Sequence, residues 1–127
     1  MNPLRRANLQ RLLKPRHIAF IGGRDATIAV NEARRRGFKG QMWAVNPKRP
    51  DLGGVPCVAS IADLPEAPDA VYLAIPAVGV VDALRTLAQM GAGGVVCFSA
   101  GFKEAGAAQA EEDLINATGD MALIGPN

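Results

Sequence analysis

The chain has 127 residues, enough for one domain with a single continuous core. Hydrophobic residues make up 49% of the sequence and charged residues 20%, a composition typical of globular domains and unlike that of disordered chains. No stretch approaches the roughly 20 apolar residues of a membrane-spanning helix, and no apolar segment of a secretory signal follows the basic N-terminus. Cys57 and Cys97 form no CxxC pair, so we expect reduced cysteines and a cytoplasmic protein.

The positive charges are concentrated in the first part of the chain. Residues 1–49 contain 12 of the 14 Lys and Arg residues but only two of the 12 acids, Asp25 and Glu32. This asymmetry favours an anionic partner, either a phosphate ester or a nucleic acid. Aromatic residues make up only 5% of the chain and no nucleic-acid recognition motif is present, so we favour the phosphate ester.

Hydrophobic periodicity and turn residues predict helices and strands that alternate along the chain. In chain order these are a helix over 4–13, a strand over 17–21, a helix over 27–36, a strand over 41–45, a short segment over 55–58, a helical turn over 60–64, a strand over 69–75, a helix over 80–90, a strand over 94–98, a helix over 104–117 and a strand over 121–124. This order predicts an α/β, Rossmann-like, doubly wound fold with a mostly parallel five-stranded sheet and helices on both faces. We expect residues 1–14 to form an N-terminal helix and residues 15–127 a single domain.

The loops that follow the strands are expected to form one site. Right-handed crossovers bring them to the same edge of a parallel sheet, and ligands of doubly wound sheets bind there. The first such loop contains Gly22 and Gly23, followed by Arg24. Glycines in this position let backbone N–H groups approach a phosphate, and Arg24 can add a charge. The fingerprint GxGxxG is absent, so this loop alone is a weak phosphate signal.

The loop after the second strand is more informative about the ligand. NAD-binding domains usually place Asp or Glu here to bind the ribose hydroxyls. This chain instead continues from Val45 and Asn46 into Pro47, Lys48 and Arg49. Two cations replace the acid, which suits a ribose phosphate. Coenzyme A and NADP both carry one, so both ligands remain possible.

Together the loops resemble those of a known family. The motifs are 18–23 (IAFIGG), 37–40 (GFKG), 45–48 (VNPK), 62–65 (ADLP), 75–77 (IPA), 99–104 (SAGFKE) and 125–127 (GPN). In this order and spacing they resemble the CoA-binding domain of NDP-forming (ADP-forming) acyl-CoA synthetases, which are related to the succinyl-CoA synthetase α subunit. The likeness covers nearly the whole chain from Leu13 onward.

The resemblance implies coenzyme A as the ligand and assigns roles to individual residues. The turn at Gly22 and Gly23 would meet the CoA phosphates, and Lys48 would hold the adenosine end by charge. Val45 and Pro47 would hold the adenosine end together with Lys48, and Asn46 of the same loop is a further candidate contact. The adenine or the pantetheine arm would pack beside Ile75, Pro76 and Ala77, and the thiol would lie near Ser99, Ala100, Gly101 and Asn127.

Two departures from the family limit the expected activity. The first loop is shorter than in most members and lacks their Ser and further glycines. The phosphorylated histidine of the family belongs to a following domain, whereas His17, the single histidine here, begins the first predicted strand and is interpreted as structural or incidental. We therefore expect CoA binding without catalysis, with no metal, no nucleic acid and no membrane involved. The expected partners are downstream ligase domains or a second ATP-grasp subunit.

Two other functions remain open. One is a stand-alone module that binds or senses CoA, and the other is the NADP-binding part of an oxidoreductase. Neither the acyl substrate nor the oligomeric state can be predicted from these residues.

Overall fold

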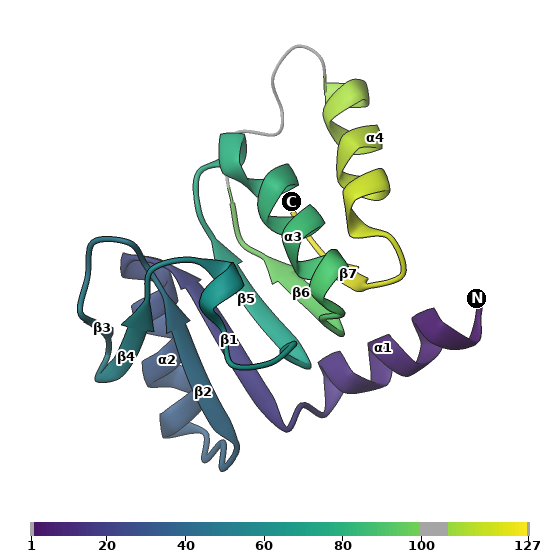
Figure 1. The fold of residues 1–127 in the computed structure, drawn as a ribbon. Coiled ribbons are helices and arrows are strands. Elements are labelled where there is room, and N and C mark those ends of the chain that lie inside the picture. The colour runs from purple at the N-terminus through teal and green to yellow at the C-terminus, as the bar shows by residue number, and fades with distance from the viewer. Residues whose placement is uncertain (1, 100–106, 127) are drawn as a thin grey trace.

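The computed structural model describes residues 2–99 and 107–126 and confirms the predicted α/β class (Figure 1). The helices are α1 (Pro3–Leu13), α2 (Arg24–Arg35), α3 (Val80–Met90) and α4 (Ala107–Thr118), with short 3-10 turns η1 (Ile61–Asp63) and η2 (Ala77–Gly79). The strands are β1 (His17–Gly22), β2 (Gln41–Val45), β3 (Asp51–Leu52), β4 (Val55–Val58), β5 (Ala70–Ala74), β6 (Gly94–Cys97) and β7 (Ala122–Ile124).

These strands form one sheet in the order β3-β4-β2-β1-β5-β6-β7. Every neighbouring pair is parallel except β3 and β4, which pair antiparallel through Leu52 and Val55. The five predicted strands are all present, but the described part of the sheet has seven strands, so the predicted number was wrong. The added strands are two and four residues long. The second of them, β4, coincides with the short segment over 55–58 that the sequence indicates without identifying it as a strand of the sheet.

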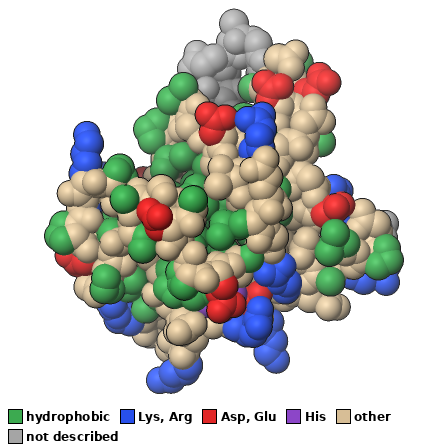
Figure 2. All heavy atoms as spheres, viewed as in Figure 1, with side chains coloured by type: hydrophobic (Ala, Val, Ile, Leu, Met, Phe, Trp, Pro, Cys, Tyr) green, Lys and Arg blue, Asp and Glu red, His purple; other side chains and the backbone are tan. Residues whose placement is uncertain are grey.

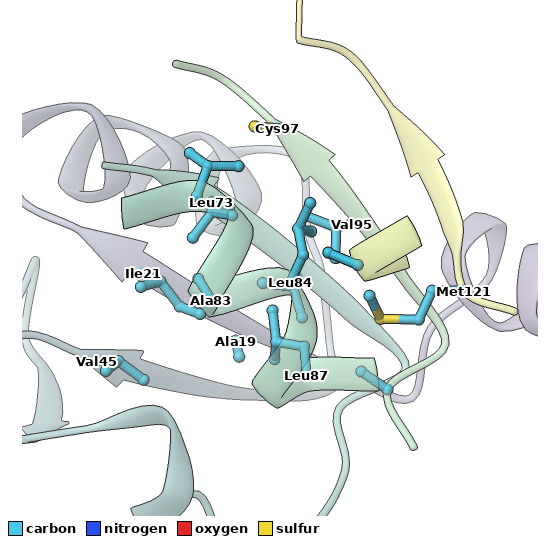
Figure 3. Packing of buried hydrophobic residues seen from close by; sticks show 14 of the residues in the cluster. Ala19, Ile21, Val45, Leu73, Ala83, Leu84, Leu87, Val95, Cys97 and Met121 are labelled. Atoms are coloured by element: carbon cyan, nitrogen blue, oxygen red, sulfur yellow. The ribbon is translucent and has the colours of Figure 1, made fainter. Parts of the chain in front are cut away.

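The sheet is covered on both faces, as a doubly wound fold requires. On one face, α3 and its neighbour α4 cover the sheet, and Leu84 and Leu87 of α3 belong to one apolar cluster with Ile21, Val95 and Met121 (Figure 3). On the other face, α2 covers β1, β2 and β4 in a separate apolar cluster. Helix α1 covers the same face beside β5, β6 and β7, where Leu12 is buried.

Asp69 connects α1 to the amino edge of the sheet. Its buried carboxylate accepts hydrogen bonds from Nε of Arg11 at 2.7 Å and from Nε, Nη2 and the backbone N of Arg16 at 2.8, 3.0 and 3.0 Å. The hydrogen bonds from Arg16, followed by the one from Arg11, hold the pKa of Asp69 well below its usual range. The carboxylate is therefore ionised in the folded protein over the whole neutral and mildly acidic range.

Helix α2 begins three residues earlier than the sequence predicts, at Arg24 instead of Thr27. Gly23 is its N-cap and supplies no side-chain hydrogen bond. The usual Ser, Thr, Asp or Asn signal for a helix start is thus missing. The polar residues Arg24 and Asp25 are typical of a loop, so the sequence alone does not predict a helix there. The N-terminus of α2 therefore lies directly at the end of β1.

Surface charge is dispersed on the visible face of the molecule. In Figure 2 the Lys and Arg side chains project around the periphery and do not gather into one patch, and hydrophobic side chains occupy much of the centre. None of the described helices has the length and apolar character needed to cross a membrane.

Candidate functional site

The register of the parallel strands brings the predicted loops to one edge of the sheet. Ile21 at the end of β1 pairs with Val45 of β2 and with Leu73 of β5, and Leu73 pairs with Cys97 of β6. The loops after these four strands therefore start side by side. The strand order reverses between β1 and β5, which is where ligands of doubly wound sheets bind.

Gly22 ends β1 at a position that only glycine can occupy. Its φ of 145° lies in a region that residues with side chains avoid, and a Cβ here would collide with the carbonyl oxygen of Ala74 on β5. The tight turn lets α2 begin at once, and the Gly23 carbonyl accepts hydrogen bonds from the backbone N and the Oγ1 of Thr27, both at 2.9 Å. The N–H groups in the first turn of a helix lack intrahelical acceptors, so this end of α2 suits an anion.

The Asn46 side chain fastens the loop after β2 to this turn. Its Nδ2 donates a hydrogen bond to the carbonyl oxygen of Gly22 at 2.7 Å. Its Oδ1 accepts hydrogen bonds from the backbone N–H groups of Lys48 and Arg49 at 2.8 and 3.0 Å. Asparagine can do both because its amide carries a donor and an acceptor. One side chain thus holds together two loops that are 24 residues apart.

Two cations lie in the loop that Asn46 holds. Lys48 and Arg49 are both exposed, and within residues 2–99 and 107–126 neither has a carboxylate oxygen within 4.0 Å. The Arg49 guanidinium reaches back to the first loop, with Nη2 3.4 Å from the position that a Cβ would take on Gly23. Arg49 was not among the residues that the resemblance implied. The sequence places it in the right loop, but the direction of its side chain depends on the fold.

The other predicted residues of the first two loops differ in exposure. Arg24, the first residue of α2, is exposed, and so is Pro47. Val45 is only 5% exposed and belongs to the core under α3 and η1. Its side chain is therefore closed to a ligand, and only its backbone can contribute to the site.

The loops after β5 and β6 are also joined by a side chain. Ser99 Oγ donates a hydrogen bond to the carbonyl oxygen of Ile75 at 2.6 Å. Pro76, the N-cap of η2, is exposed, while Ile75 and Ala77 are half-buried, so this part of the edge is apolar. The remaining predicted residues, Ala100, Gly101 and Asn127, lie outside the described residues.

The residues at the carboxyl edge of the sheet suit ligand binding better than covalent catalysis. Burial raises the pKa of the Cys97 thiol, which a hydrogen bond with Ser99 only partly offsets. The thiolate, which is the nucleophilic form, is therefore scarce at neutral pH. In the described part of the chain no three His, Cys, Asp or Glu side chains gather as a metal site would require.

The histidine lies at the opposite edge of the sheet. His17 is 4% exposed and stacks on Trp43, with the ring centroids 4.6 Å apart. Its Nδ1 accepts a hydrogen bond from the backbone N–H of Asp69 at 3.0 Å, so Nε2 carries the hydrogen and donates to Oε1 of Glu66, also at 3.0 Å. Both ring nitrogens are occupied within the fold, which confirms the structural interpretation of this residue.

Comparison with known proteins gives the same ligand class as the loops. The family model "CoA binding domain" matches residues 16–126. A trans-feruloyl-CoA synthase from an unknown prokaryotic organism is 41% identical over 128 residues, which cover 94% of this chain and 18% of that protein. The ADP-forming acetate–CoA ligase I of Archaeoglobus fulgidus is 34% identical over 126 residues, again covering 94% of this chain and 18% of the ligase.

A solved structure agrees in fold. The apo form of the dinucleotide-forming acetyl-coenzyme A synthetase 1 of Candidatus Korarchaeum cryptofilum superposes with a TM-score of 0.82 and 28% identity, covering 94% of this chain and 28% of that chain. The chain therefore spans only a fraction of the length of the ligases it matches. Because the family model matches most of its length, the chain belongs to the CoA binding domain family.

Proposed function

We propose that this domain binds coenzyme A along the carboxyl edge of its sheet and serves as the CoA-binding part of an NDP-forming acyl-CoA synthetase. The observation that carries the proposal is the cationic loop that Asn46 fastens to the turn at Gly22. The Arg49 guanidinium lies beside the N-cap of α2 and Lys48 stands in the same loop, so that a phosphorylated nucleotide could meet both charge and backbone donors here.

The other loops suit the remaining parts of the ligand. The exposed ring of Pro76 and the half-buried Ile75 and Ala77 offer an apolar surface beside which adenine or the pantetheine arm can lie. Ser99, held on the Ile75 carbonyl, marks the β6 side of the edge, to which we assign the thiol end together with Ala100, Gly101 and Asn127. In this arrangement CoA is the acyl acceptor, and the domain presents its thiol to the rest of the enzyme.

The acid–thiol ligase reaction of the proposed parent enzyme needs groups that the described residues do not provide. His17 is enclosed at the wrong edge of the sheet and cannot carry a phosphoryl group to the CoA site. We therefore assign activation of the acid to partner ligase domains or to an ATP-grasp subunit. A cytoplasmic location belongs to the same proposal, since the free Cys57 and Cys97 suit a reducing compartment.

Titration calorimetry tests the ligand. The domain is titrated with CoA, with 3′-dephospho-CoA and with NADP. We expect CoA to bind most tightly, because both the ribose phosphate and the pantetheine arm have contacts at this edge. Tighter binding of NADP than of CoA would instead favour an oxidoreductase domain.

A thiol assay tests the absence of catalysis. The domain is incubated with CoA, ATP, Mg²⁺ and acetate, and the free thiol is measured over time. We expect no consumption of the thiol. Formation of acetyl-CoA by the isolated domain would show that it carries its own activating group.

A further inference from the structure

Arg49 has an unusual position for an exposed loop residue, because its guanidinium turns back onto the glycine turn of another loop. Its Nη2 and Cζ lie 3.4 and 3.6 Å from the position that a Cβ would take on Gly23. The planar group thus lies beside Gly23, the N-cap of α2. A positive charge therefore lies beside the N-terminus of α2, where the first-turn N–H groups lack intrahelical acceptors.

Asn46 fixes this arrangement through the backbone. Its Oδ1 holds the Arg49 N–H at 3.0 Å, while its Nδ2 holds the Gly22 carbonyl at 2.7 Å. The backbone at Arg49, from which the side chain extends, thus cannot move independently of the glycine turn. Within residues 2–99 and 107–126 no carboxylate pairs with this guanidinium, so its five N–H donors are free for a ligand.

The glycine turn by itself is a poor site for two linked phosphates. It is short and it lacks the GxGxxG pattern. Few backbone N–H groups can therefore reach a diphosphate, which carries two charges. An arginine fork matches two phosphate oxygens at once and compensates for the missing donors.

We propose that Arg49 is the residue that recognises the diphosphate of the ligand and that Asn46 positions it, whereas Lys48 recognises the phosphate on the ribose. This assignment of Arg49 and Lys48 to different phosphates rests on the proposed function, CoA binding at the same edge. It assigns the two neighbouring cations of one loop to two different phosphate groups. The ligand class is a nucleotide with a 5′-diphosphate linkage, and the ribose phosphate contributes separately.

Two CoA analogues separate the roles. CoA and 3′-dephospho-CoA share the diphosphate and differ only in the ribose phosphate, and both are titrated into wild type, Arg49→Ala and Lys48→Ala. We expect Arg49→Ala to weaken both ligands by about tenfold, the value of a charge-assisted contact in a partly exposed site. Lys48→Ala should weaken CoA alone. Lys39→Ala, which removes an exposed charge before β2 at the other edge, is the matched control and should change neither.

The outcomes distinguish this inference from the proposed function. If wild type binds CoA and Arg49→Ala binds both ligands as wild type does, or loses affinity for CoA only, the role of Arg49 is wrong while CoA binding stands. If wild type binds neither ligand, the proposed function itself is wrong. Arg49→Lys keeps the charge without the fork, and we expect it to recover only part of the affinity for each ligand.

A double-mutant cycle tests the positioning role of Asn46. If Asn46 acts by placing Arg49, its replacement removes most of the benefit of the arginine. We then expect Asn46→Ala combined with Arg49→Ala to bind dephospho-CoA about as weakly as Arg49→Ala alone. Additive losses would contradict this role. Circular dichroism of each variant verifies that the compared proteins are folded.

Discussion

The Asn46 amide donates a hydrogen bond to the Gly22 carbonyl oxygen at 2.7 Å and so joins the ends of β1 and β2 at the carboxyl edge. Few contacts in the described structure bear so directly on the proposed site, because the same side chain also orders the backbone of Lys48 and Arg49. The geometry of the first two loops is therefore a single unit, and a change at Asn46 should affect both.

We expect Asn46→Ala to reduce both stability and ligand affinity. The loss of its hydrogen bonds should lower the free energy of unfolding by about 1 kcal/mol, as for other partly buried hydrogen bonds. CoA affinity should fall several-fold because the two cations lose their fixed positions. Urea unfolding and calorimetric titration measure the two effects. An unchanged dissociation constant would show that the loop is held in another way.

Gly22→Ala should destabilise the fold strongly. The residue has a φ of 145°, and the new Cβ would strike the Ala74 carbonyl on β5. Strain and collision together should cost about 3 kcal/mol or more. The control is Gly37→Ala, where φ is 84° but no atom lies within 4 Å of the new Cβ. This variant should lose only about 1 kcal/mol from the backbone strain. Equal losses in the two variants would argue against the collision.

Asp69→Asn should destabilise the protein and change its acid sensitivity. The buried carboxylate accepts hydrogen bonds from Arg11 and Arg16, and replacing it should cost roughly 2 to 3 kcal/mol. Asp82→Asn, which breaks an exposed pair with Arg85, is the control and should have little effect.

The pH dependence follows from the direction of the Asp69 pKa, which the hydrogen bonds from Arg16 lower in the folded state. The unfolded chain binds the proton at higher pH than the folded protein does. The stabilisation is therefore complete above the ordinary Asp pKa of about 4 and is lost as the pH falls below it. The wild-type free energy of unfolding should decline from about pH 5 downward, and Asp69→Asn should decline less steeply. Parallel curves would refute this role for Asp69.

Substitution of His17 should affect folding and leave binding unchanged. His17→Phe keeps the stacking on Trp43 but leaves the buried N–H of Asp69 without its acceptor. We expect a loss of about 1 to 3 kcal/mol in the free energy of unfolding. The CoA dissociation constant, measured well below the melting temperature, should stay at the wild-type value. A selective loss of CoA affinity in a folded variant would place His17 in the ligand site after all.

Much of the fold could be predicted from local pattern. The uninterrupted apolar run of β5 predicts a strand covered on both faces, and the Gly91 stop of α3 is the expected left-handed C-cap, with a φ of 89°. The start of α2 and the strands β3 and β4 were less predictable. Gly23 gives no side-chain cap signal, and the pairing of Leu52 with Val55 is evident only once the chain has turned.

The candidate site, like the fold, depends partly on residue type and partly on the tertiary structure. The sequence by itself determines that an acid is missing after β2 and that Lys48 and Arg49 stand there, because charge is a property of residue type. It also determines the alternation of strands and helices that sends these loops to one edge. Only the tertiary structure decides that Asn46 binds the Gly22 carbonyl, that Val45 is closed to a ligand, and that Arg49 lies against Gly23. The contacts of Asn46 and Arg49 join residues more than 20 positions apart, and the parallel register of β1 and β2 creates them. The burial of Val45 comes from packing under α3 and η1.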